Sequence, residues 1–94
     1  MMAIYRIIAW KDIPASVEVR DGGDQVTLQL SERFQALIDS AAMQLGADEQ
    51  EAYLDHWTAT HGERAGSARE VGAALVAELE ERFPQFIAVA FRRP

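Results

Sequence analysis

The amino-acid sequence predicts an α+β domain, in which helices pack against an antiparallel sheet of about four strands. Two observations lead to this fold class. Polar and apolar side chains alternate through much of the first third of the chain, which is the period of a strand. From position 31 the apolar side chains recur every three or four residues, as in amphipathic helices. The 94 residues have the length of one domain, and we expect a single domain over residues 1–94.

Three strands are expected at the start of the chain. Residues 3–10 are rich in β-branched and aromatic side chains, which indicates a well-buried strand. Pro14 closes this segment, because proline has no amide hydrogen to donate to a sheet. Residues 17–20 and 26–30 then alternate on either side of a Gly-Gly turn, a pattern typical of a β-hairpin.

Three helices and one more strand are expected to follow. The helices are predicted over residues 31–46, 48–62 and 67–83, because each begins at a Ser or Asp that can accept hydrogen bonds from first-turn amides. Pro84 breaks the last helix. Residues 86–91 are apolar and uncharged, which predicts a final strand and the chain order β-β-β-α-α-α-β.

The first and last predicted strands are apolar on both faces, so both are expected at the centre of the sheet, paired with each other. That pairing would fold the helices back onto the sheet. The apolar side chains that follow these periods make up the expected core: Ile4, Ile8, Val17, Leu28, Phe34, Ile38, Leu45, Trp57, Leu75, Leu79, Ile87 and Val89.

Composition excludes several classes of function. The chain has no cysteine, so disulfides, thiolate metal ligands and cysteine nucleophiles are ruled out. A formal net charge of −6 with scattered basic residues argues against a nucleic-acid partner. No apolar run approaches the ~18 residues of a membrane span, and no secretion signal is visible. We therefore expect a cytoplasmic protein that binds neither nucleic acid nor membrane.

No catalytic, metal-binding or cofactor-binding residue is expected. His56 and His61 are five residues apart, so they would not share a helix face as a metal-binding pair does. The serines lie in no nucleophile-elbow motif, and the Gly-Gly turn is not followed by the lysine and helix of a phosphate-binding loop. These patterns predict no bound metal and no cofactor, and they favour a protein without catalytic activity.

Trp10, Lys11, Asp12 and Phe91 are the candidate interaction residues. A large aromatic side chain beside a proline turn suits an interface anchor, and polar residues at a strand end often form binding sites. The alternative is a plain turn, in which Asp12 accepts hydrogen bonds from nearby amides. Phe91 becomes a candidate because one apolar face of the sheet would remain uncovered by three helices. A second chain would then cover it, and a symmetric homodimer is the simplest case.

Three short motifs together resemble one small bacterial family, the virulence-factor domain. They are Trp-Lys-Asp-Ile-Pro at 10–14, Arg-Phe at 33–34 running on to Ala-Leu-Ile-Asp-Ser-Ala-Ala-Met at 36–43, and Tyr-Leu-Asp-His-Trp at 53–57. The chain departs from the family pattern at Ala9, where an aromatic residue would be expected. The resemblance implies a small stand-alone relative of domains that also form the C-terminal part of larger virulence-linked proteins. It carries over no catalytic residues.

Two hypotheses for function follow. The first is a small non-catalytic accessory or protein-interaction domain, bound to a protein partner or to a second copy of itself. The second comes from the resemblance, because the stand-alone relatives are associated with genes of folate- and corrinoid-linked one-carbon metabolism. It is a small ligand-binding or catalytic subunit in which Lys11, Asp12 and His56 would line a pocket.

Overall fold

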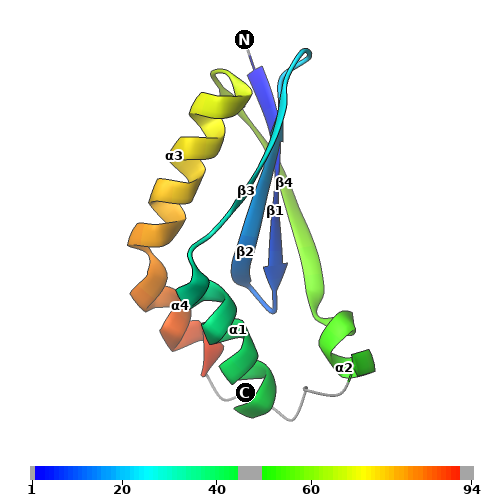
Figure 1. The fold of residues 1–94 in the computed structure, drawn as a ribbon, viewed down its shortest axis with the longest axis vertical. Coiled ribbons are helices and arrows are strands. Elements are labelled where there is room, and N and C mark those ends of the chain that lie inside the picture. Colours follow the sequence, from blue (N-terminus) through cyan, green and yellow to red (C-terminus); the bar gives the residue numbers. More distant parts are fainter. Residues whose placement is uncertain (1, 45–49, 92–94) are drawn as a thin grey trace.

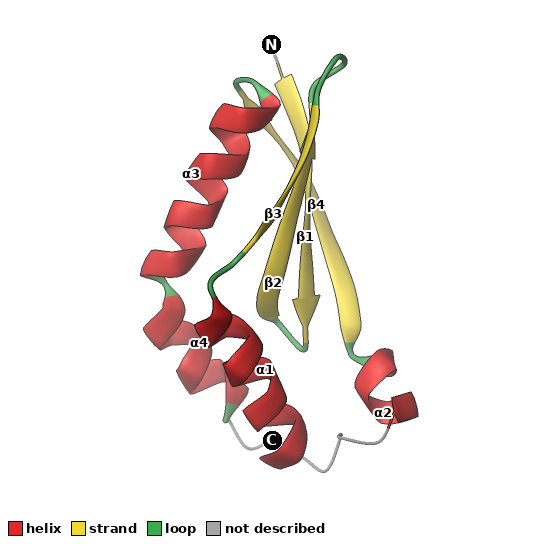
Figure 2. Cartoon of the chain, in the orientation of Figure 1, coloured by secondary structure: helices red, strands yellow, loops and turns green. Residues whose placement is uncertain are grey.

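The computed structural model describes residues 2–44 and 50–91, and it confirms the α+β class with a four-stranded antiparallel sheet (Figure 1, Figure 2). Three of the helices pack on the sheet, whereas a short helix lies just before the start of the last strand. The elements in chain order are β1 (Met2–Trp10), β2 (Ile13–Arg20), β3 (Gln25–Gln29), α1 (Glu32–Gln44), α2 (Gln50–Asp55), β4 (Trp57–Ala65), α3 (Ala68–Glu81) and α4 (Phe83–Ala90).

The sheet has the strand order β3-β2-β1-β4, so β1 and β2 are central and β3 and β4 form the edges. β1 pairs with β4 over nine residues, from Met2 opposite Ala65 to Trp10 opposite Trp57. Its pairing with β2 is interrupted by a bulge between Ile8 and Ala9. The apolar first strand is therefore central, as its composition predicted.

Two tight turns join the first three strands. Lys11 and Asp12 form a two-residue turn with φ angles of 47° and 71°, the conformation that a right-twisted hairpin requires. The predicted Gly-Gly hairpin is confirmed, with Gly22 at φ 62°. Asp21 holds this second turn, because its Oδ1 accepts hydrogen bonds from the amides of Gly23 and Asp24.

The core lies between the sheet and the layer of α1, α3 and α4; in Figure 1, α3 runs along the left of the sheet and α1 lies below it. Val17 and Val19 point from β2 into this layer and are buried. The expected core residues Val17, Phe34, Ile38, Leu75 and Leu79 are buried as predicted. The expectation is wrong for Ile4 and Ile87, which are exposed, and Leu45 lies outside the described residues. The remaining expected core positions are half-buried: Ile8, Leu28, Trp57 and Val89.

The predicted strand over residues 86–91 is wrong, because this segment lies mostly in the helix α4. Pro84 occupies the first turn of α4, where a missing amide hydrogen carries no penalty, so it starts a helix as well as ending one. Phe83 and Phe86 pack on Phe34 of α1, with ring centroids 4.9 and 6.0 Å apart. A short apolar run does not distinguish a strand from a buried helix, and packing on α1 decides between them here.

The fourth strand is β4, in a stretch that was predicted to complete the second helix. α2 ends at Asp55, and the predicted helix end at residues 61–62 is therefore wrong. Thr58 and Thr60 are β-branched, which favours the extended conformation, and β4 supplies the second neighbour that a central β1 requires. The start signal at Asp48 and the stop signal at Gly46 lie outside the described residues.

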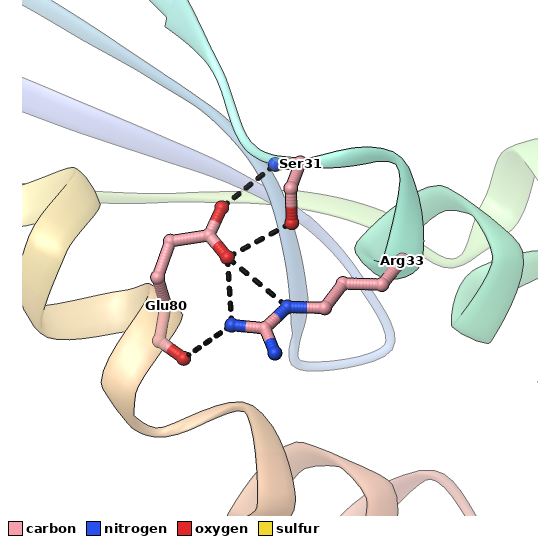
Figure 3. A network of polar contacts seen from close by, with 3 residues as sticks. All are labelled: Ser31, Arg33 and Glu80. Atoms are coloured by element: carbon pink, nitrogen blue, oxygen red, sulfur yellow. Dashed lines mark hydrogen bonds and ion pairs between the residues drawn. The ribbon is translucent and has the colours of Figure 1, made fainter.

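Polar contacts fasten the helices to one another and to the sheet. The carboxylate of Glu80 in α3 accepts hydrogen bonds from the Ser31 amide at 2.7 Å, the Ser31 hydroxyl at 2.8 Å and the Arg33 guanidinium at 2.9 Å (Figure 3). Asp21 Oδ2 accepts a hydrogen bond of 2.7 Å from the amide of Ala68, the first residue of α3. The predicted cap Ser67 also accepts a hydrogen bond from the Glu70 amide.

Candidate interaction surface

Trp10, the expected interface anchor, is fully buried within the chain. Its ring stacks on Tyr53 of α2 with centroids 5.7 Å apart, and it meets His56 edge-on at 5.3 Å. The indole Nε1–H donates a hydrogen bond of 2.7 Å to the Tyr53 carbonyl. Trp10 therefore joins α2 to the end of β1 and offers no free surface in this fold.

The other candidate residues remain accessible but lie apart from one another. Lys11 and Asp12 are exposed in the β1–β2 turn, where the Lys11 amide donates a hydrogen bond to the His56 carbonyl. Phe91 is 43% exposed and stands at the C-terminal end of α4, in the helix layer and not on the sheet. Lys11 and Asp12 therefore lie in one turn, and Phe91 lies on a different element and does not form a site with them.

A continuous surface is found instead on the side of the sheet opposite α1, α3 and α4. Every second residue of a strand points to this side of the sheet. Residues directly opposite one another on neighbouring strands point to the same side, so the strand register shows which residues share it. We call it the open face and define it by ten residues of the three strands β1, β2 and β4: Met2, Ile4, Arg6, Ile8, Ser16, Glu18, Arg20, Ala59, His61 and Glu63.

Apolar side chains form a line along β1 in the middle of the open face. Met2 is 55% exposed and Ile4 is 44% exposed, although β1 is a central strand. Ile8 lies on the same face beyond the charged Arg6 and is half-buried. The layer of α1, α3 and α4 lies on the other side of the sheet and leaves Met2 and Ile4 exposed, whereas Ile8 lies two residues before Trp10, on which α2 packs.

Charged side chains flank this line in two rows across the sheet. In one row Arg20 and Glu63 lie on either side of Ile4. In the next row Glu18 and His61 lie on either side of Arg6. Arg6 donates to both carboxylate oxygens of Glu18, at 2.8 and 3.0 Å, so this pair is locked within the chain.

A hollow of about 290 Å³ lies on the same face, lined by Ile4, Arg6, Glu18, Arg20, Gln25 and His61 with two neighbours. The open face is therefore concave at this point and lined by both apolar and charged side chains.

The sequence carried a signal for this surface, because Ile4, Arg6 and Ile8 alternate with the buried or half-buried residues of β1. Because most residues on both faces of β1 are apolar, the sequence alone did not show which of them would be exposed.

The described residues show no group of three or more His, Asp or Glu side chains that could hold a metal ion. The two histidines are separated, because His56 packs against Trp10 and His61 lies on the open face. Across residues 2–44 and 50–91, no helix has the length and apolar character that a bilayer span needs.

The sequence pattern of the family described as "Virulence factor" matches residues 8–86. The chain belongs to the virulence factor family. The match extends from the last three residues of β1 into α4, so it includes every strand and helix of the fold in whole or in part. Comparison with curated proteins and with solved structures found no match. The virulence factor domain therefore has to be interpreted from its own surface.

Proposed function

We propose that this virulence factor domain is a non-catalytic protein-interaction domain, and that the open face is its binding surface. The observation that carries the proposal is the exposure of Ile4 and Met2 in the middle of a four-stranded sheet. Apolar side chains on a central strand are usually buried, and the helix layer buries the other face of the same sheet. An apolar centre with a polar rim is also the general composition of a protein–protein interface.

The arrangement of the ionisable side chains supports a binding role over a catalytic one. Arg33 with Glu80 and Arg64 with Glu78 connect helices and strands, and Arg6 is engaged with Glu18. His56 is packed against an indole ring. These groups are engaged in contacts within the chain, whereas the open face combines exposed apolar and charged side chains on one side of the sheet.

Site-specific cross-linking in the cell that makes the protein tests the proposal. A photoreactive amino acid is placed at position 4, on the open face, and separately at position 43, where Met43 is 71% exposed on α1. Position 43 is the matched control because its side chain is also apolar and is more accessible than that of Ile4, but it lies in the helix layer. We expect covalent adducts with a polypeptide from position 4 and none from position 43.

Adducts that form from position 43 and not from position 4 would contradict the proposal, because they would place the interaction on the helices. Irradiation that yields no polypeptide adduct from position 4 would contradict it as well.

A further inference from the structure

We infer that the polypeptide bound at the open face is a second copy of this chain, packed face to face as a β-sandwich about a two-fold axis parallel to β1. The inference rests on the proposed function, because it names the partner of the same surface. Its basis is the distribution of charge across the three strands of that face.

The row that contains Ile4 has opposite charges at its two ends. Arg20 is the register partner of Ile4 on β2, and Glu63 is its register partner on β4. Within the described residues neither Arg20 nor Glu63 forms an ion pair. Both charges are exposed and therefore available to another molecule.

A two-fold axis parallel to β1 exchanges the two sides of the face. It sets Ile4 against Ile4 of the second copy, and Arg20 against Glu63 of the second copy. In the next row the same operation sets His61 against Glu18 of the second copy.

An axis running across the strands through the row that contains Ile4 would instead bring Arg20 onto Arg20 and Glu63 onto Glu63. An axis across the strands between this row and the next would set Ile4 against Arg6 of the second copy. Like charges in direct contact are unfavourable, and so is an apolar side chain set against a guanidinium, so the pattern favours the axis parallel to β1.

Arg6 lies on the axis and would approach Arg6 of the second copy. Its charge is balanced within its own chain, because Glu18 accepts two hydrogen bonds from the guanidinium. The apolar line of Met2, Ile4 and Ile8 also follows the axis, so each of these side chains meets its own counterpart. The hollow beside Ile4 provides space for Ile4 of the second copy.

The open face has the size of a small interface. Its strands β1 and β4 are nine residues and about 30 Å long, and three strands spaced at about 4.8 Å give a width of about 14 Å. Sheets stack about 10 Å apart in an aligned sandwich. These dimensions give a footprint of roughly 400 Å² per partner, which is smaller than the roughly 800 Å² per partner of a standard specific interface. We therefore expect a weak dimer that forms at high micromolar protein concentration.

Reversing the charge at position 20 or at position 63, the two ends of the row that contains Ile4, tests the inference. The variants Arg20→Glu and Glu63→Arg each place like charges opposite one another across the axis. We expect each variant alone to dimerise at least tenfold more weakly than the unmodified protein, measured by sedimentation equilibrium. An equimolar mixture of the two should dimerise again, because each contact then joins one Glu to one Arg. The double variant should dimerise as well.

Arg69→Glu on α3 is the matched control, since it makes the same change at an exposed arginine outside the face, and its dimerisation should be unchanged. Circular dichroism checks that each variant is folded. The inference is overturned if the unmodified protein is a monomer at hundreds of micromolar. It is equally overturned if the single variants dimerise normally or if their mixture fails to regain the dimer. A monomer that still forms adducts from position 4 with a different polypeptide would overturn the second copy while leaving the proposed function intact.

Discussion

Glu80 is the side chain that joins the start of α1 to the end of α3 (Figure 3). Partial burial acts to raise the pKa of Glu80, but the donors on Ser31 and Arg33 outweigh it, so the pKa lies below its ordinary value. The stability that results is present above the unfolded-state pKa of about 4.3 and is lost as the pH falls through the lower, folded-state pKa. Glu80 therefore makes the fold sensitive to acid.

Replacing Glu80 by glutamine removes the charge and part of this network. We expect the free energy of unfolding at pH 7 to fall by about 1 kcal/mol, a modest value because the side chain is a quarter exposed and solvent screens its ion pair. At pH 3 the difference between Glu80→Gln and the unmodified protein should be smaller. Urea unfolding at the two pH values measures both. Glu81→Gln, at the exposed neighbour, is the control and should change neither value by more than a few tenths of a kcal/mol.

Trp10 shows what could not be predicted from the sequence at the scale of one residue. Its position at the end of a strand, beside a turn, was correctly derived from residues 11–14. Its burial depends on Tyr53 and His56, which are more than forty residues away in the chain. No local pattern indicates that α2 packs at this point. Trp10 was therefore predicted to be an exposed interface residue, whereas its indole joins α2 to β1.

At the scale of elements, the first three strands and the beginnings of α1 and α3 could be predicted. Their signals are local: alternation in β2 and β3, a Gly-Gly turn, and a Ser67 cap. β4 could not be predicted, because the Tyr53, Leu54 and Trp57 spacing extends a helical pattern into it. The pairing of β4 with β1 is a long-range interaction, and it overrides that local preference.

β4 is also the element in which one glycine has a defined role. The Tyr5 ring lies over Gly62, its register partner, and a Cβ atom at Gly62 would overlap that ring. We expect Gly62→Ala to lower the free energy of unfolding by about 1–3 kcal/mol, because the ring must move out of its place.

A double-mutant cycle with Tyr5→Ala isolates this contact. When the ring is absent, the added methyl group meets no overlap, and the effect of Gly62→Ala should nearly vanish. Equal losses from Gly62→Ala with and without the Tyr5 ring would show that the ring is not the cause. Gly23→Ala, at a turn glycine with open space around it, is the control for a general effect of removing glycine.

At the scale of the whole molecule, an uncovered face of the sheet could be predicted from the sequence, but the residues that lie on it could not. An uncovered sheet face was expected because few helices were available to cover two faces. Its residues could not be named, because the expected pairing of residues 3–10 with residues 86–91 would have placed different side chains on it. The observed pairing with β4 brings Glu63 and His61 to the face. The charge pattern on which the proposed symmetric partner rests exists only in the folded sheet.

The acidic charge of the whole chain affects how association should be measured. Each copy carries a formal charge of −6, so two copies repel one another at long range. At an ionic strength of about 0.15 M this repulsion is screened beyond about 8 Å, whereas contacts across the interface are closer than that. Measurements that test the proposed dimer should therefore be made at physiological salt concentration.

The most direct test of the account is an isotope-filtered nuclear Overhauser experiment on an equimolar mixture of ¹³C-labelled and unlabelled protein. It detects only hydrogens that are close to one another across two molecules. We predict intermolecular signals from the methyl groups of Ile4 and Met2, and none from Met43 or Ile87 in the helix layer. Intermolecular signals confined to Met43 and Ile87, or none at all at millimolar concentration, would contradict the assignment of the open face as the surface that binds a second copy.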